Sequence, residues 1–147
     1  MNIIKTNIIK TTTPEETVQS IVKIINDSEY TFSSMGVAAF GPLCLDKSVK
    51  ECGSVTSTPK IAWQNFPLLE KLMKGIKPEK MTQDFRVAFD TDCNILASFE
   101  LENGGHVGIK DSIAYITVGT GVGVGFVVNG ECIHGMIHPE GGHVSVQ

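Results

Sequence analysis

Two carboxylates separated by one residue are the side chains of this sequence best suited to catalysis. Asp90 and Asp92 follow the strand-like stretch 86–89 and precede the helix-like stretch 95–101. At such a junction the strand holds the acids rigidly, and the helix N-terminus stabilises their ionised forms. We interpret them either as groups for general acid–base chemistry or as caps of the helix, and these residues alone leave both interpretations open.

A glycine-rich segment is the second candidate site. Every other residue from Gly119 to Gly125 is glycine, and apolar, β-branched runs flank the segment. Successive backbone amides in such a turn form a concavity for anions, to which Thr120 adds a hydroxyl donor. The turn lacks the lysine ending of the Walker loop, and Val124 breaks the Gly-x-Gly-x-x-Gly pattern. The segment is therefore predicted either to bind phosphate or to let two sheets pack closely.

A third cluster combines histidines with a carboxylate. His134, His138, Glu140 and His143 lie close together in the sequence, at spacings that fit no zinc motif carried on a helix. Side chains of these types ligate metals or hydrogen-bond polar ligands. The cluster therefore indicates either a metal site or a polar sugar-binding site.

The elements that must position these residues begin with an expected strand at residues 2–10. A Thr-Pro pair at 13–14 then marks the start of a helix, which should end at 26–27. Residues 33–40 are predicted to form a buried strand that ends in Gly41-Pro42. Such a strand delivers a loop to the sheet edge at which ligand sites of open α/β sheets lie.

Less regular sequence follows before the candidate residues. Residues 43–61 lack periodicity, and so long an irregular stretch in a compact domain indicates function. We expect a helix over 68–75, a short strand over 86–89 and a helix ending at 103–105. Two strands then flank the glycine segment, and Asn129-Gly130 begins a further hairpin.

Composition excludes several functional classes. The chain has 147 residues, 41% hydrophobic, with a net charge of −4 and a pI near 5.5, so nucleic acid is an unexpected partner. No apolar run has the length of a membrane span, and no signal peptide is recognisable, so we expect no membrane partner and a cytoplasmic location. Four cysteines without a C-x-x-C spacing suit reduced thiols.

Together these segments resemble the ROK family of sugar kinases, and within it the fructokinase branch. Five motifs occur in the family's order, and the resemblance runs from about residue 36 to residue 147. They are GVAAFGP at 36–42, TPK at 58–60 with WQNF at 63–66, AFDTDCN at 88–94, the glycine segment 117–125, and HPEGGH at 138–143.

The resemblance implies roles for individual residues. Asp92 matches the catalytic base that takes the proton from the attacking sugar hydroxyl. Gly119, Thr120 and Gly121, with Gly123 beside them, match the second phosphate-binding turn. Asp90-Thr91 stands where the family's glucokinases usually have Glu-Asn, which favours fructose over glucose.

The sugar side is assigned in the same way. Glu140 and His143 match residues that contact sugar hydroxyls, as Asp92 does, and His143 also matches a ligand of the family's structural zinc. Asn65 is assigned to the sugar from its position in the motif at 63–66.

The fold implied is α/β of the actin-like, ribonuclease-H-like ATPase kind, here incomplete. Residues 1–108 would be the remainder of the N-terminal lobe, and residues 109–147 the beginning of the C-terminal lobe. The first phosphate loop and the cysteine-rich zinc and nucleotide part of the family are not matched. The resemblance implies the ATP-dependent phosphorylation of a hexose, most simply fructose to fructose 6-phosphate, with ATP, Mg²⁺ and Zn²⁺ as cofactors and a homodimer as partner state.

Because those two parts are unmatched, the isolated chain is expected to have little or no activity. A non-catalytic sugar-binding or regulatory ROK remnant is the competing hypothesis. Its repressor version is disfavoured, since no basic helical pair opens the chain. A third hypothesis is a truncated product that hardly folds, with an exposed and unpaired sheet edge.

Overall fold

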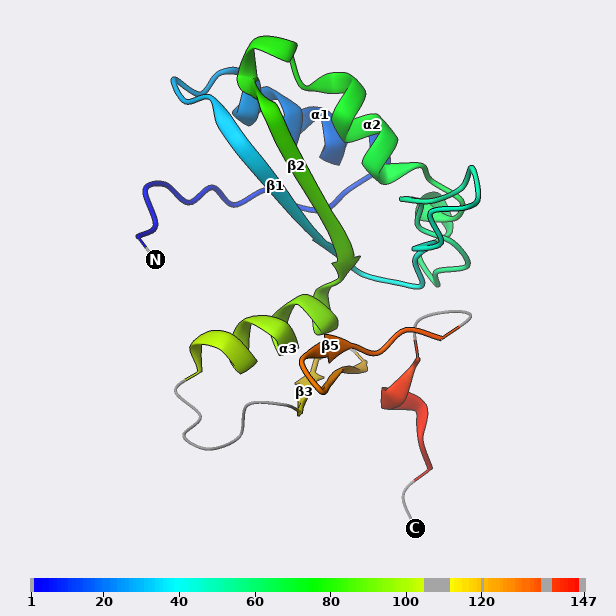
Figure 1. The fold of residues 1–147 in the computed structure, drawn as a ribbon. Helices are drawn as coiled ribbons and strands as arrows, with labels where there is room; N and C mark the ends of the chain where they lie inside the picture. Colours follow the sequence, from blue (N-terminus) through cyan, green and yellow to red (C-terminus); the bar gives the residue numbers. More distant parts are fainter. Residues whose placement is uncertain (1, 105–111, 120, 136–138, 146–147) are drawn as a thin grey trace.

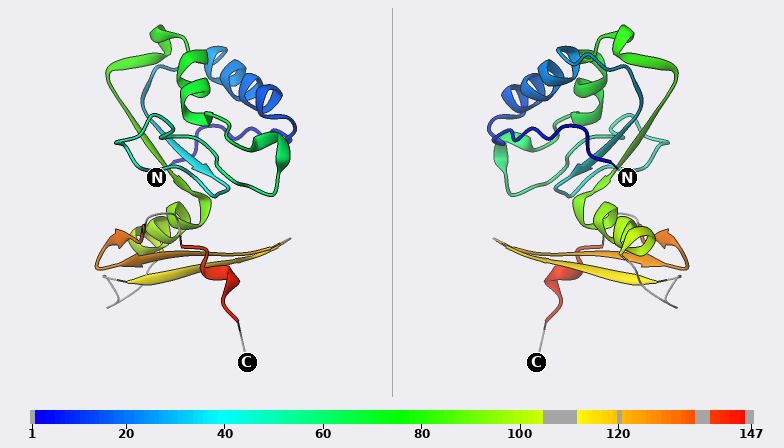
Figure 2. Two further views of the ribbon diagram at one scale, coloured as in Figure 1. Left: turned by 90° about the vertical axis from the view of Figure 1, so that its right-hand side faces the viewer. Right: turned by 90° about the vertical axis from the view of Figure 1, so that its left-hand side faces the viewer.

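The computed structural model describes residues 2–104, 112–119, 121–135 and 139–145. Its strands form two separate sheets, a parallel pair and a three-stranded antiparallel sheet. Helix α3 (Asp92–Asn103) lies between the two sheets in Figure 1 and in both views of Figure 2. The expected mixture of helices and sheets is therefore confirmed, and the junction between the sheets falls at the start of α3.

The first helix forms where the sequence predicted it. Helix α1 (Pro14–Asn26) begins after Thr13, whose hydroxyl accepts a hydrogen bond of 3.4 Å from the backbone N–H of Glu16. The proline fits the first turn, because the N–H that it lacks would have had no partner there. The helix packs against α2 (Leu68–Gly75), the second expected helix.

The parallel sheet pairs β1 (Phe32–Ala39) with β2 (Met81–Thr91). Side chains of Met35, Val37 and Ala39 face the core, whereas the alternate residues of β1 are exposed. The expectation of a buried strand at 33–40 is therefore wrong for one of its two faces. Only one face of this sheet contacts the core that α1 and α2 help to form, so the strand alternates instead of being apolar throughout.

The strand expected at residues 2–10 is absent, because the chain there is extended but pairs with no other strand among the described residues. Ile3, Ile4 and Ile8 are 76%, 76% and 98% exposed. β-branched residues favour a strand only where a neighbour completes the hydrogen-bonded ladder. The segment is anchored where Trp63 Nε1 donates a hydrogen bond of 3.1 Å to the carbonyl oxygen of Thr12.

The long stretch between β1 and α2 is irregular, as predicted, but it carries much of the core. Trp63 is 4% exposed and packs edge-on against Phe40 and Phe66, with ring centroids 5.2 and 5.6 Å away. Short 3₁₀ helices occur at Ile61–Trp63 and Pro78–Lys80. The core is made by Val18, Ala39, Leu43, Val55, Trp63, Phe66, Leu68 and Leu72.

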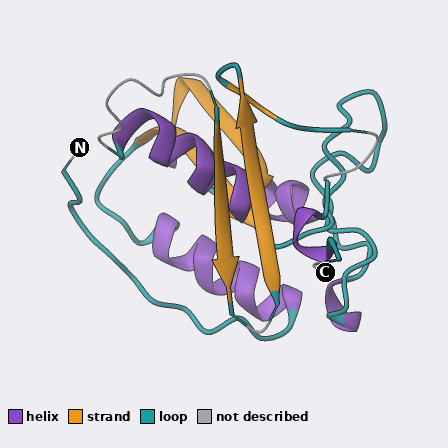
Figure 3. Cartoon of the chain, turned by 90° about the horizontal axis from the view of Figure 1, so that it is seen from below, coloured by secondary structure: helices purple, strands orange, loops and turns teal. Residues whose placement is uncertain are grey.

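The second sheet is an antiparallel meander of β3 (Ile113–Val118), β4 (Val122–Val128) and β5 (Glu131–Cys132). Asn129 and Gly130 both have positive φ and form the tight turn that the Asn-Gly pair predicted. Helix α3 packs mainly on β3 and β4, and Figure 3 shows these strands in front of the helices. A 3₁₀ turn at Gly141–His143 lies on β4.

The predicted boundary between residues 108 and 109 lies outside the described residues. Among the helices that the structure describes, none combines the length and apolarity that crossing a membrane requires.

Candidate active site

A cavity of about 510 Å³ opens where the carboxyl ends of β1 and β2 meet the glycine turn of the second sheet. Parallel pairing in the register Ala39 with Thr91 brings the two strand ends side by side. The residues after them therefore border one space, as expected for a ligand site in an α/β fold. The lining residues are Phe40, Gly41, Thr91, Asp92, Cys93, Thr117, Val118, Gly119, Gly121, Val122, Gly123, Val124 and Glu140.

Asp92 is the carboxylate that the parallel sheet presents to this cavity. It is the first residue of α3, and its Oδ1 accepts a hydrogen bond of 2.9 Å from the backbone N–H of Cys93. The helix cap is Thr91, whose hydroxyl accepts from the N–H of Asn94 at 3.3 Å. The capping interpretation of the two acids is therefore wrong. Asp92 remains an exposed carboxylate at a helix N-terminus.

Asp90 differs from Asp92 because both of its carboxylate oxygens are engaged. Its Oδ1 accepts hydrogen bonds from the N–H of Thr91 at 2.7 Å and from Nδ2 of Asn94 at 3.2 Å. Its Oδ2 lies 2.8 Å from Nε2 of His134. Asp90 is also absent from the cavity lining. The structure thus separates two acids that the sequence left equivalent, and only Asp92 is placed to take a proton from a ligand.

The glycines of this segment have two different surroundings. A Cβ added to Gly119 or Gly121 would meet no atom within 4 Å, so this part of the turn is open toward a ligand. A Cβ on Gly123 would come within 2.6 Å of Cys93 Sγ, and one on Gly125 within 2.1 Å of the Cys93 carbonyl oxygen. The later glycines therefore admit helix α3, rather than a second sheet, against β4.

The cavity has carboxylates but no cationic side chain in its described lining. Asp92 and Glu140 are acidic, so an anionic ligand must be stabilised there by backbone N–H groups or by a cation bound with it. Open glycines fit the first requirement, and two carboxylates fit a hard cation such as Mg²⁺. Burial raises the pKa of the Cys93 thiol, which keeps that neighbour of Asp92 protonated and uncharged. The residues present are thus compatible with a nucleotide bound together with Mg²⁺.

Glu140 reaches the cavity because the chain around it lies directly on β4. A Cβ on Gly142 would come within 1.8 Å of the carbonyl oxygen of Val122, and one on Gly141 within 2.7 Å of the Phe126 ring. His143 Nδ1 lies 3.6 Å from Oε2 of Glu140, and its side chain is 77% exposed. The structure therefore places Glu140 in the cavity lining and His143 beside it.

The described residues contain no complete set of zinc ligands. Nowhere in the described ranges do three or more His, Cys, Asp or Glu side chains come together as metal ligands would. His134 contacts Asp90, and His138 lies outside the described residues, as does Thr120. The metal interpretation of the histidine cluster gains no support from this geometry.

Asn65 lies apart from these groups. It has a positive φ of 56°, and its N–H donates a hydrogen bond of 3.3 Å to the carbonyl oxygen of Thr56. Its side chain is exposed and does not line the cavity. Contact between Asn65 and a sugar stays a prediction.

Several residues at the site were given no individual role from the sequence. Phe40 and Gly41 line the cavity because β1 pairs in parallel with β2, and Thr117 lies within 3.7 Å of Cys93 Sγ. For Phe40 and Gly41, the Gly-Pro pair after β1 was the indication in the sequence, since it marked a loop at the sheet edge. The contact between His134 and Asp90 could not be predicted from neighbouring residues, because 44 residues separate the two in the sequence.

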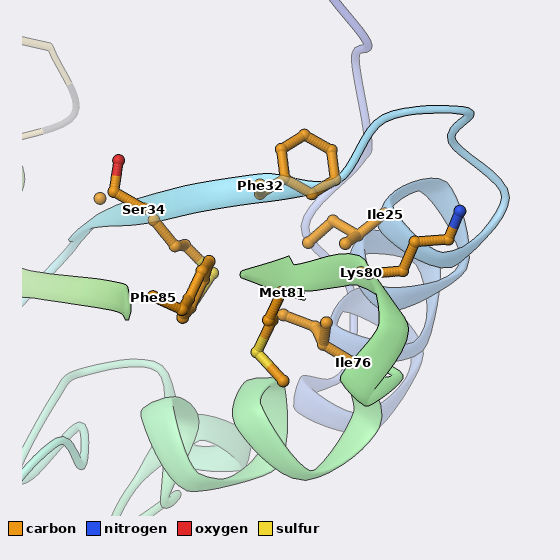
Figure 4. Close-up of a pocket in the computed structure, with 9 residues that line it drawn as sticks. Ile25, Phe32, Ser34, Ile76, Lys80, Met81 and Phe85 are labelled. Carbon is orange, nitrogen blue, oxygen red and sulfur yellow. The ribbon is translucent and has the colours of Figure 1, made fainter. Parts of the chain in front are cut away.

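A second cavity, of about 270 Å³, lies at the opposite, amino ends of β1 and β2 (Figure 4). Lys80 is its only basic lining residue, and its ammonium group donates a hydrogen bond to the Ser28 carbonyl oxygen. The rest of the lining is apolar apart from Ser34, and it contains no carboxylate. It therefore lacks the groups for acid–base chemistry that the first cavity has.

Comparison with known proteins gives a consistent result. The ROK family matches residues 2–147. A fructokinase of Lactococcus lactis subsp. cremoris is 39% identical over 142 residues, which is 97% of this chain and 44% of the relative. A fructokinase of Zymomonas mobilis subsp. mobilis is 40% identical over 139 residues, 92% of this chain and 44% of the relative. The chain thus spans less than half the length of these relatives.

Solved structures share the fold. A ROK family glucokinase from Streptomyces griseus, in complex with glucose and AMPPNP, matches with a TM-score of 0.68 at 24% identity, covering 92% of this chain and 40% of the other. The ROK hexokinase from Thermus thermophilus gives a TM-score of 0.60 at 23% identity, over 90% and 42% of the two chains. The structure accordingly represents part of the actin-like ATPase fold.

Proposed function

The chain belongs to the ROK family, and from that membership we propose that it forms the sugar-binding and part of the phosphate-binding site of an ATP-dependent fructokinase. The observation that carries the proposal is the convergence of Asp92, the open glycine turn and Glu140 on one cavity. The fructokinase names of the relatives that match most of the chain support fructose as the hexose.

Asp92 is the proposed general base. The strand end and the helix N-terminus hold its carboxylate at the cavity, and its free oxygen can accept the proton of a sugar hydroxyl. Bound MgATP would supply the phosphoryl group and offset the charge on its oxygens. Removal of the proton leaves the hydroxyl oxygen as the nucleophile.

The glycine turn is the proposed phosphate contact. Gly119 and Gly121 leave space for a ligand group to approach the backbone closely. Thr120, between them, is the proposed hydroxyl donor. Gly123 borders the same cavity but packs against Cys93, so its proposed part is to let the turn and the helix approach each other.

The sugar side combines groups from the end of β2, the start of α3 and the turn that lies on β4. Glu140 borders the cavity together with Asp92 and is the proposed acceptor for a second sugar hydroxyl. His143, beside Glu140, and Asn65 are proposed as further contacts. Thr91, which also lines the cavity, is the proposed determinant of fructose over glucose. All four cysteines are free thiols, and we take this as support for a reducing, cytoplasmic location. A homodimer, which the family resemblance implies, is also proposed.

The proposal is tested in two steps. Calorimetric titration of the purified chain with fructose, glucose and MgATP, each alone, should show fructose binding in preference to glucose. The chain is then exchanged for the matching segment of the Lactococcus lactis fructokinase, and the chimera is assayed for fructose 6-phosphate. A folded chimera that forms no hexose phosphate would overturn the kinase proposal. Fructose binding by the chain together with such an inactive chimera would favour the non-catalytic sugar-binding alternative.

A further inference from the structure

One side-chain contact joins the two sheets beside the cavity. Asp90 lies near the end of β2 in the parallel sheet, and His134 follows β5 of the antiparallel sheet. Their Nε2 and Oδ2 atoms are 2.8 Å apart, and the side chains are 39% exposed for His134 and 17% for Asp90. The contact therefore links the carboxyl edge of one sheet directly to the other sheet.

The surrounding hydrogen bonds fix the roles of the atoms. Oδ1 of Asp90 already accepts from the Thr91 N–H and from Asn94 Nδ2, so Oδ2 is the oxygen available to His134. At 2.8 Å from a carboxylate, Nε2 of His134 must carry the hydrogen. Asn94 is fully buried, and turning its amide round would set its oxygen against Asp90 Oδ1. The same amide nitrogen lies 3.4 Å from Nε2 of His134, farther than the 2.8 Å between Nε2 and the carboxylate, so the hydrogen on Nε2 is directed to Asp90 and the three side chains form one connected group.

This network connects the two carboxylates of the cavity. Asp90 is separated from Asp92 only by Thr91, the cap of α3, so fixing Asp90 fixes the first turn of that helix. His134 precedes the segment that carries Glu140 across β4. Displacing the imidazole would let these two parts of the chain move relative to each other.

We propose that His134 is a positioning residue that acts through Asp90 to set the separation of Asp92 and Glu140 across the cavity. Its consequence for sugar binding rests on the proposed function, but the positioning itself does not. The His134 side chain is 39% exposed, so its contact contributes little to the free energy of unfolding, because water screens it. The proposal therefore predicts a large effect on the cavity and a small effect on stability.

The experiment uses isotope-labelled full chain and the variants His134→Ala, His134→Gln, Asp90→Ala and the double alanine variant. Glutamine can place an N–H near the position of Nε2, so it should restore the contact. Lys23→Ala is the matched control, because it breaks another exposed pair, with Asp27 at 2.7 Å, far from the cavity in the fold. NMR reports the imidazole tautomer of His134 and the backbone amides of Cys93 and Gly141.

We expect the Nε2–H tautomer in the native chain. His134→Ala should shift the amides of Cys93 and Gly141, His134→Gln should restore them, and the control should leave them unchanged. Fructose affinity should fall about tenfold in His134→Ala, and the double variant should bind no more weakly than the weaker single variant, as for coupled residues.

Three results would overturn the positioning role. They are an Nδ1–H tautomer in the native chain, Cys93 and Gly141 amides that do not respond to His134→Ala, and additive losses of affinity in the double variant. The tautomer is measured on the native chain, so it decides even if the alanine variants fail to fold. If the native chain binds no fructose, the proposed function loses support, while the tautomer and the amide shifts still decide the inference.

Discussion

The backbone of Gly125 lies directly against the carbonyl of Cys93, so closely that a Cβ on Gly125 would come within 2.1 Å of the carbonyl oxygen. This approach seats the first turn of α3 on β4. Asp92, the residue before Cys93, is thereby held beside the turn formed by Gly119 and Gly121. Because Gly125 has no side chain, the proposed base and the proposed phosphate contact can border one cavity.

Gly125→Ala should destabilise the chain strongly. The added methyl group would collide with backbone atoms, which cannot rotate away as a side chain can, and overpacking of this kind costs about 1–3 kcal/mol or more. Thermal unfolding followed by circular dichroism should show the loss. Gly119→Ala is the matched control, because its methyl group would meet no atom within 4 Å. Equal melting temperatures for the two variants would contradict this account of the glycines.

Gly119→Ala should nevertheless impair nucleotide binding. Its methyl group would occupy the open space that the proposed function assigns to a phosphate group. Calorimetry with MgATP on the chain, or on the chimera if the chain alone binds no nucleotide, measures the effect. Unchanged nucleotide affinity in the chimera would remove this turn from the phosphate site.

Asp92→Asn should abolish catalysis without unfolding the chain. The asparagine keeps the size of the side chain but cannot take a proton, and general-base help of this kind contributes about 10²- to 10⁴-fold in rate. The measurement is the rate of hexose phosphorylation by the chimera with the Lactococcus lactis fructokinase. An Asp92→Asn chimera that is as fast as its parent would exclude Asp92 as the base.

Gly142→Ala should weaken sugar binding more than it perturbs the parallel sheet. A Cβ at this position would meet the Val122 carbonyl oxygen at 1.8 Å, so the turn that carries Glu140 must lift from β4. Fructose affinity by calorimetry should fall, while the fluorescence of Trp63, which is buried in the other layer, should not change. Altered Trp63 emission would show that the disturbance spreads through the whole fold.

Cys93 should react more slowly with iodoacetamide than the partly exposed Cys44, Cys52 and Cys132. Burial hinders access and raises the thiol pKa, so little of the reactive thiolate is present near neutral pH.

The raised pKa of Cys93 also determines how the free energy of unfolding changes with pH. The unfolded chain loses this proton first, so the contribution of Cys93 is complete below about pH 8.5 and is lost as the pH rises through the folded-state pKa.

Mass spectrometry of timed alkylation measures the order of reaction. Urea unfolding at pH 7 and pH 9.5, compared between the parent chain and Cys93→Ala, isolates the pH effect of this thiol. A parent chain that gains stability relative to the variant at the higher pH would contradict the raised pKa.

Local sequence determined the features that a few neighbouring residues can specify. Thr13 and Pro14 set the start of α1, and Asn129-Gly130 set the turn after β4, because their side chains and allowed φ angles act within one turn of the backbone. The motif order likewise identified the family, since residues 2–147 match it. Asp92 and the glycine turn were recognised as candidates on the same basis.

Tertiary structure decided what depends on neighbours from elsewhere in the chain. The isoleucines of residues 2–10 favour a strand, but no partner strand pairs with them among the described residues. Asp90 and Asp92 are alike in the sequence, but in the structure Asp90 contacts the distant His134, whereas Asp92 lines the cavity. Gly119 and Gly125 are likewise distinguished by where α3 packs. Short-range conformational preferences are carried by each residue, whereas burial, hydrogen-bond partners and free space exist only once distant segments meet.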